Sequence, residues 1–148
     1  LKRLVLAAGL LHDVSWRSDP SSRAEECFDN AMRGNLGGLH HRARVMLAMA
    51  LLHRYRKNGK LEKYNKLKLL LNQNEKNIAK VIGRAMRLGA SLAAGNADVL
   101  HKASLHRSAK CLELRLDSSV ANYAGETVEM RLCELAACLG CKGTVTVQ

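Results

Sequence analysis

The residues most suggestive of chemistry are a histidine and an aspartate that stand side by side near the start of the chain. His12 and Asp13 follow an apolar segment that we expect to be a helix. Such a pair can present an imidazole and a carboxylate to one metal ion, and His53 is a further possible ligand. The stretch 87–94 offers no carboxylate to complete the set. We interpret His12, Asp13 and His53 as a degraded metal site, and expect neither bound metal nor a catalytic residue.

Positive charge is the second feature that could carry a function. The chain has 24 Lys and Arg against 13 Asp and Glu, a net charge of +11, and a field of that sign attracts polyanions. Basic residues crowd the stretch 54–68, and others recur every three or four residues over 76–87, which places them on one helical face. The residues that we expect to bind a polyanion are Arg17, Arg23, Arg54, Arg56, Lys57, Lys80, Arg84 and Arg87. The alternative interpretation is a solvated surface.

The kind of polyanion is limited by the aromatic content. Only 3% of the residues are aromatic, so the chain has few platforms on which the bases of a single-stranded nucleic acid could stack. We therefore expect a phosphate polymer without bases. Trp16, the one tryptophan, is expected to pack the first helix against the second, although Arg17 and Arg23 could reach a phosphate at the start of the helix that Asp19-Pro20 opens.

Cysteine usage and hydropathy bear on the compartment. Five cysteines at irregular spacing predict reduced thiols, and Cys138-x-x-Cys141 has no partner motif that would favour a zinc or redox site. The longest apolar run holds about eight residues, against the ~20 that cross a bilayer. We expect no membrane contact and a cytoplasmic parent protein, from which this chain, beginning at Leu1, would be an excised part.

The elements that must position these residues follow from hydrophobic periodicity. We expect a mainly α fold of about five helices over 1–95, followed over 96–148 by a small cap with the order ββαβ. We interpret 1–95 as a helical domain and 96–148 as a small α+β cap, because the pattern changes at Gly95, and the alternative is one continuous domain. The expected helices are 1–12, 20–32, 39–56, 61–71, 75–94 and 127–139, and the expected strands are 103–106, 111–116 and 143–148.

An ordered set of short motifs resembles one family. The set is Leu10-Leu11-His12-Asp13-Val14-Ser15-Trp16-Arg17, then Pro20 and Arg23, then His40-His41-Arg42-Ala43-Arg44 and Leu51-Leu52-His53-Arg54-Tyr55-Arg56, and later Arg87-Leu88-Gly89 and Cys111-Leu112-Glu113-Leu114-Arg115-Leu116. It resembles the C-terminal domain of the bacterial Ppx/GppA phosphatases, which are exopolyphosphatases and guanosine pentaphosphate phosphohydrolases. The resemblance implies an HD-like helical bundle with His12, Asp13 and His53 at the HD-like positions. Ser15 departs from a common glycine and Ala93 from a common acidic residue.

The resemblance also implies a function for the parent protein. Two actin-like domains ahead of Leu1 would hold a Mg²⁺-dependent site that releases terminal phosphate from polyphosphate. This chain would bind the inorganic polyphosphate, contact those domains and support a homodimer, and would be inactive by itself. Two alternatives stay open: an autonomous HD-type phosphohydrolase acting on nucleotides such as (p)ppGpp, and a purely structural domain. The choice between polyphosphate and guanosine pentaphosphate also stays open.

Overall fold

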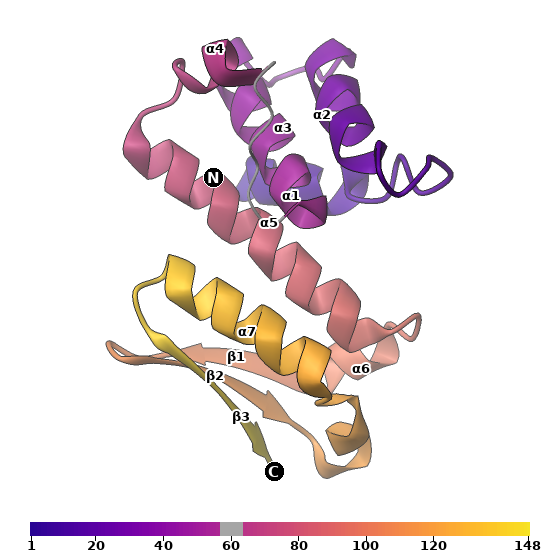
Figure 1. Ribbon diagram of the computed structural model, residues 1–148, viewed down its shortest axis with the longest axis vertical. Helices are drawn as coiled ribbons and strands as arrows, with labels where there is room; N and C mark the ends of the chain where they lie inside the picture. Colours follow the sequence, from indigo (N-terminus) through magenta and orange to yellow (C-terminus); the bar gives the residue numbers. More distant parts are fainter. Residues whose placement is uncertain (57–63) are drawn as a thin grey trace. The chain divides into compact units, whose positions relative to one another are not determined.

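The computed structural model describes residues 1–56 and 64–148, and it is mainly helical with one small sheet near the C-terminus (Figure 1). This confirms the predicted fold class. The chain divides into two compact units, Leu1–Met86 and Arg87–Gln148, which we call unit 1 and unit 2. The division lies inside helix α5 (Gln73–Ala93). Gly95, with φ of +88°, follows the end of that helix.

Unit 1 is a group of helices around one buried helix. The members are α1 (Lys2–Leu11), α2 (Arg23–Arg33), α3 (His41–Tyr55), α4 (Asn65–Lys68) and the first part of α5. Residues 47–53 of α3 are all buried, so this helix has neighbours on every side there. His40 caps its start, because the imidazole Nδ1 accepts a hydrogen bond from Ala43 N at 3.0 Å.

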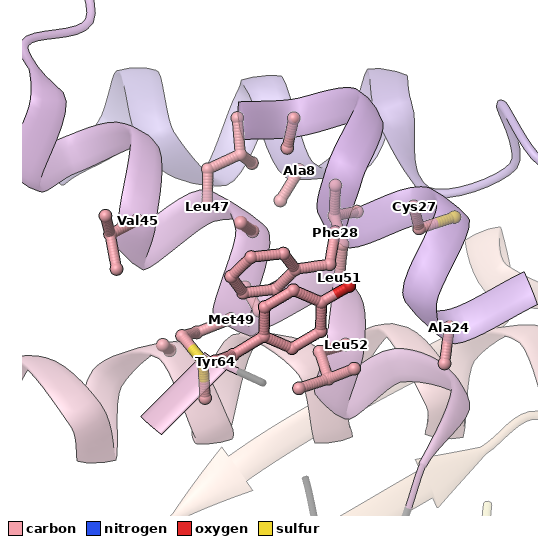
Figure 2. Packing of buried hydrophobic residues seen from close by; sticks show 14 of the residues in the cluster. Ala8, Ala24, Cys27, Phe28, Val45, Leu47, Met49, Leu51, Leu52 and Tyr64 are labelled. Carbon is pink, nitrogen blue, oxygen red and sulfur yellow. The ribbon is translucent and has the colours of Figure 1, made fainter. Parts of the chain in front are cut away.

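The core of unit 1 gathers around an aromatic pair (Figure 2). The rings of Phe28 and Tyr64 stack with their centroids 3.8 Å apart, next to leucines of α3. The Tyr64 hydroxyl donates a hydrogen bond to Asp29 Oδ1 at 2.7 Å, so its polar end is satisfied. Full burial of a side chain such as Phe28 contributes about 1.5–3 kcal/mol, which makes this pair a main support for α3.

The segment before α2 differs in detail from its prediction. Asp19 Oδ1 accepts a hydrogen bond from Ser21 N at 2.8 Å, as an N-terminal cap would. Pro20 does not begin the regular helix, however, because 20–22 form a turn and α2 starts at Arg23. The extra turn is joined to the helix, since Arg23 N donates to Asp19 O at 2.9 Å.

Unit 2 is a three-stranded sheet with helices. Its strands are β1 (Ala103–Arg107), β2 (Cys111–Leu116) and β3 (Lys142–Val147), and its other elements are α6 (Asp98–His101), the 3-10 helix η2 (Ser118–Tyr123) and α7 (Glu126–Cys138). β1 pairs antiparallel with β2, and β3 pairs parallel with β2. Leu112, Leu114 and Leu116 are buried at alternate positions, and α7 packs along β2 and β3 (Figure 1).

The predicted ββαβ order is therefore confirmed, while two short elements, α6 and η2, were missed. Each covers one or two turns, too short for a periodic pattern to reveal. Of the helix expected over 61–71 the structure shows α4, and residues 61–63 lie outside the described part. All five cysteines are free thiols. In the described part of the chain, no helix has the length and apolar character needed to cross a membrane.

Candidate functional site

The positive charge of the chain is concentrated in unit 1. Residues 1–86 hold 17 Lys and Arg against 7 Asp and Glu, a net charge of +10, whereas residues 87–148 hold 7 against 6, a net charge of +1. Because attraction for a polyanion depends on the local excess of positive charge, unit 1 is where such a partner would be drawn. Most of the residues proposed from the sequence also belong to unit 1.

Helices α3 and α5 come unusually close at one glycine. A Cβ added to Gly83 would lie 2.5 Å from the carbonyl oxygen of Ala50 and 2.5 Å from Cβ of His53. Real Cβ atoms do not approach backbone this closely, so only glycine allows the contact. The close approach brings the next residue of α5, Arg84, beside the last turn of α3. Arg84 is only 4% exposed, which is rare for an arginine.

The side chain that this contact encloses is His53. It is 9% exposed, and among the described residues its buried Nδ1 has no hydrogen-bond partner. Burial, and after it the positive charges of Arg84, Lys80 and Lys68, lower the pKa of His53 to about 4. His53 is therefore neutral at pH 7. We call His53, Lys68, Lys80 and Arg84 the His53 cluster.

The His53 cluster draws on three helices of unit 1. His53 ends the buried run of α3, Lys68 ends α4, and Lys80 and Arg84 stand four residues apart on α5, so they share a face of that helix. Lys80 is exposed, and Lys68 is half-buried with its ammonium group 3.5 Å from Asn65 Oδ1. Arg84 is buried. The cluster thus has a buried neutral imidazole on α3 and an exposed cation, Lys80, on α5.

A second group of cations surrounds Tyr55 at the end of α3, and it is used mainly within the protein. Arg23 donates to Trp16 O at 2.8 Å and Ser18 O at 3.0 Å. Arg56 donates to Ser21 O at 3.1 Å and pairs with Glu25 at 3.5 Å. These bonds hold the segment before α2 against α3. Arg23 and Arg56 therefore have partners within the protein, and their binding to phosphate stays a prediction.

Arg54 differs from its neighbours in that group. Its guanidinium lies 4.8 Å from the ring centre of Tyr55, which is a cation–π contact, and the Arg23 guanidinium lies 5.9 Å from the same centre. Burial raises the pKa of Tyr55 to about 12, so its hydroxyl remains a donor. Arg54 follows His53 directly in the chain and is half-buried.

The remaining predicted residues are dispersed. Trp16 is 57% exposed with the Arg17 guanidinium 5.0 Å from its ring, so the prediction that Trp16 packs two helices together is wrong. The apolar contacts of α1 are made by Leu4 and Ala8 instead. Arg87 is half-buried and belongs to unit 2, so it is not assigned to the cluster. Lys57 lies outside the described residues.

The HD-like residues form hydrogen bonds of a structural kind. His12 Nδ1 is 2.6 Å from Gly9 O, which closes the end of α1. The Tyr55 hydroxyl donates to His12 O at 2.5 Å and approaches Asp13 Oδ1 at 3.4 Å. No three His, Cys, Asp or Glu side chains in the described part of the chain gather closely enough to hold a metal ion.

Two residues of the site were not recognised from the sequence. Lys68 was seen as one member of a basic run, and only the fold shows that it approaches His53. Gly83 was overlooked, although an isolated glycine inside a helical pattern is a recognised sign of a close backbone approach or a packing role. Its position in the middle of the apolar pattern of α5 was the available signal.

Comparison with models of protein families gives a match. The family model described as "Exopolyphosphatase, C-terminal" matches residues 2–146, nearly the whole chain. A search of curated proteins finds no match. The matched range covers nearly all of both units and includes every residue of the His53 cluster. The chain therefore belongs to the exopolyphosphatase C-terminal domain family.

Proposed function

We propose that this exopolyphosphatase C-terminal domain binds inorganic polyphosphate on unit 1, with the His53 cluster as the principal contact. The observation that carries the proposal is the convergence of Lys68, Lys80 and Arg84, from two helices, on a histidine that is kept neutral. A polyphosphate chain placed against these side chains would be attracted by their positive charge. Release of the counterions of the polyphosphate would add to the affinity.

Each residue of the cluster would have a different role in binding polyphosphate. The exposed Lys80 and half-buried Lys68 would pair with successive phosphates, since an ammonium group acts as a point charge without a fixed geometry. Arg84, buried beside His53, would strengthen the local field and hold the helices in place. His53 would remain neutral, so it would add no further positive charge to the repulsion among the cations. Dimer formation by this domain stays a prediction.

The test is a titration of the 148-residue chain with long-chain polyphosphate, followed by calorimetry at two salt concentrations. Contact with about three cations predicts that affinity falls about 20-fold between 50 and 200 mM salt. The double variant Lys68→Gln, Lys80→Gln should lose about tenfold in affinity at the lower salt concentration and most of its salt dependence.

A charge-matched control separates contact from general attraction. Lys2→Gln with Lys110→Gln removes the same charge from exposed positions outside the cluster, and it should change the affinity by less than about threefold because screened charges act only over ~10 Å. Equal losses in the two double variants would mean that the cluster is not the contact. If the unmodified chain shows no affinity at physiological salt, the basic face serves a structural partner and the proposal fails.

A further inference from the structure

The outer strand β1 of the sheet in unit 2 is exposed along almost its whole length. The strand order is β1-β2-β3, so in the described part of the chain only β2 pairs with β1 (Figure 1). Residues 104–107 are all exposed, on both faces of the strand. Leu105 is 45% exposed although Leu114, directly opposite on β2, is buried, because α7 packs mainly against β3 and β2. Such an outer strand is a template on which another strand can pair.

The hydrogen bonds to β2 show which backbone groups of β1 are still available. Asp117 N donates to Lys102 O at 3.0 Å, and Ser108 N donates to Cys111 O at 2.8 Å, at the two ends of the antiparallel pair. Bonded positions alternate in such a pair, so the backbone also faces β2 at 104 and 106. The N–H and C=O groups at 103, 105 and 107 therefore point away from β2.

One register lets two copies of β1 pair through these outward groups. With a two-fold axis at Leu105, the outward groups of Leu105 meet those of its counterpart, and those of Ala103 meet those of Arg107. About six backbone hydrogen bonds would form, since each pair of residues exchanges two. An axis at Arg107 would place two arginines directly opposite each other, which is destabilising. An axis at Ala103 would extend the pairing into α6.

The side chains and charge of unit 2 are compatible with a second copy as the partner. The exposed Leu105 would contact its counterpart, which removes apolar surface from water on both copies. On the other face Ser104 would oppose His106, and these two polar groups already lie 3.0 Å apart within one chain. Unit 2 has a net charge of +1 against +10 for unit 1, so two copies of unit 2 repel each other little.

We propose that β1 is a self-association edge, at which two copies of this chain pair antiparallel about Leu105 and join their sheets. One pair of five-residue strands is a small interface, so the dimer should be weak and should dissociate on dilution. The proposal assigns a homodimer a surface and a register. It uses no residue of the His53 cluster, so this pairing and polyphosphate binding can fail independently of each other.

The experiment is sedimentation equilibrium of the 148-residue chain without polyphosphate, over a series from about 5 to 500 µM. A reducing agent keeps the five cysteines as thiols, so that no disulfide joins two chains. The average mass should rise with concentration from 16.3 kDa toward twice that value. A mass that stays at 16.3 kDa over the whole series would overturn the proposal.

A pair of lysine substitutions locates the contact. Leu105→Lys should raise the dissociation constant about tenfold, because it removes the apolar contact and places two ammonium groups directly opposite each other. Val147→Lys is the matched control, since Val147 is 52% exposed on the other outer strand, β3, and the dimer should be retained. Equal losses in the two variants would contradict the assignment to β1.

A proline substitution tests the backbone pairing directly. The N–H of Leu105 points away from β2, so Leu105→Pro removes only donors that the second copy needs, and outer strands tolerate proline at such positions. The variant should keep its circular dichroism spectrum and lose about tenfold or more in self-association. Self-association as strong in Leu105→Pro and Leu105→Lys as in the original chain would refute the pairing.

Discussion

Gly83→Ala is expected to lower the free energy of unfolding of the chain by about 2–4 kcal/mol. The added methyl group would lie 2.5 Å from both the Ala50 carbonyl oxygen and His53 Cβ. Both belong to α3, and neither is the end of a flexible side chain, so the two helices must move apart. The expected loss exceeds the gain of about 1 kcal/mol that alanine normally brings to a helix interior.

The same helix provides the control for this prediction. Gly89 also lies within α5, and a Cβ added there would meet nothing within 4 Å. Gly89→Ala should therefore stabilise the chain by about 0.5–1 kcal/mol. Urea unfolding followed by circular dichroism measures both variants. If Gly83→Ala behaves like Gly89→Ala, the close approach of α3 and α5 is not present in solution.

Acidification from pH 7 to pH 4 is expected to remove about 3 kcal/mol of stability through His53 alone. Burial, together with Arg84, Lys80 and Lys68, lowers the pKa of this histidine from 6.5 to about 4 in the folded chain. In the unfolded chain, His53 takes up its proton at the ordinary pKa. The unfolded state therefore binds more protons between these two values. The stabilisation is fully present above pH 6.5 and is lost as the pH falls toward 4.

A comparison of two histidine variants separates the contribution of His53 to the pH dependence of stability from that of the carboxylates. Hydrogen bonds lower the pKa of Asp19, Glu75, Glu113 and Asp117, so these carboxylates also lose stabilisation in acid, below the range of His53. His53→Gln should flatten the stability profile between pH 4 and 6.5, and His41→Gln, at an exposed position, should leave it unchanged. The measurement is urea unfolding at several pH values. A His53→Gln profile as steep as that of the original chain would contradict the buried, neutral assignment.

Strong local signals predicted much of the fold. The structure contains α3, which its apolar run predicted, and β2, which the alternation of Cys111 to Leu116 predicted. The break at Gly95 predicted the end of α5. The order ββαβ followed from the change of period after α5. The short α6 and η2 escaped because one or two turns carry no period. Pro20 misled because a proline is compatible with the turn before a helix as well as with the helix itself.

The candidate site could be predicted only in part. Charge and spacing identified Lys80 and Arg84, but the depth of each depends on how α5 is rotated against α3. That rotation is set by the close contact at Gly83, which places Arg84 in the buried side of the helix. Arg23 and Arg56 donate hydrogen bonds to backbone carbonyl groups, and a sequence does not show which carbonyl groups the fold will bring to them. Tertiary contacts determine both the burial of Lys80 and Arg84 and the hydrogen-bond partners of Arg23 and Arg56.

The most direct test of the central claim is a hydrogen–deuterium exchange footprint of the chain with and without long-chain polyphosphate. Binding at the His53 cluster predicts slower exchange in α4 and over 80–84 of α5, with the effect lost in the Lys68→Gln, Lys80→Gln variant. Protection that leaves these two segments unchanged, or that persists fully in the variant, would contradict the assignment of the polyphosphate contact to this cluster.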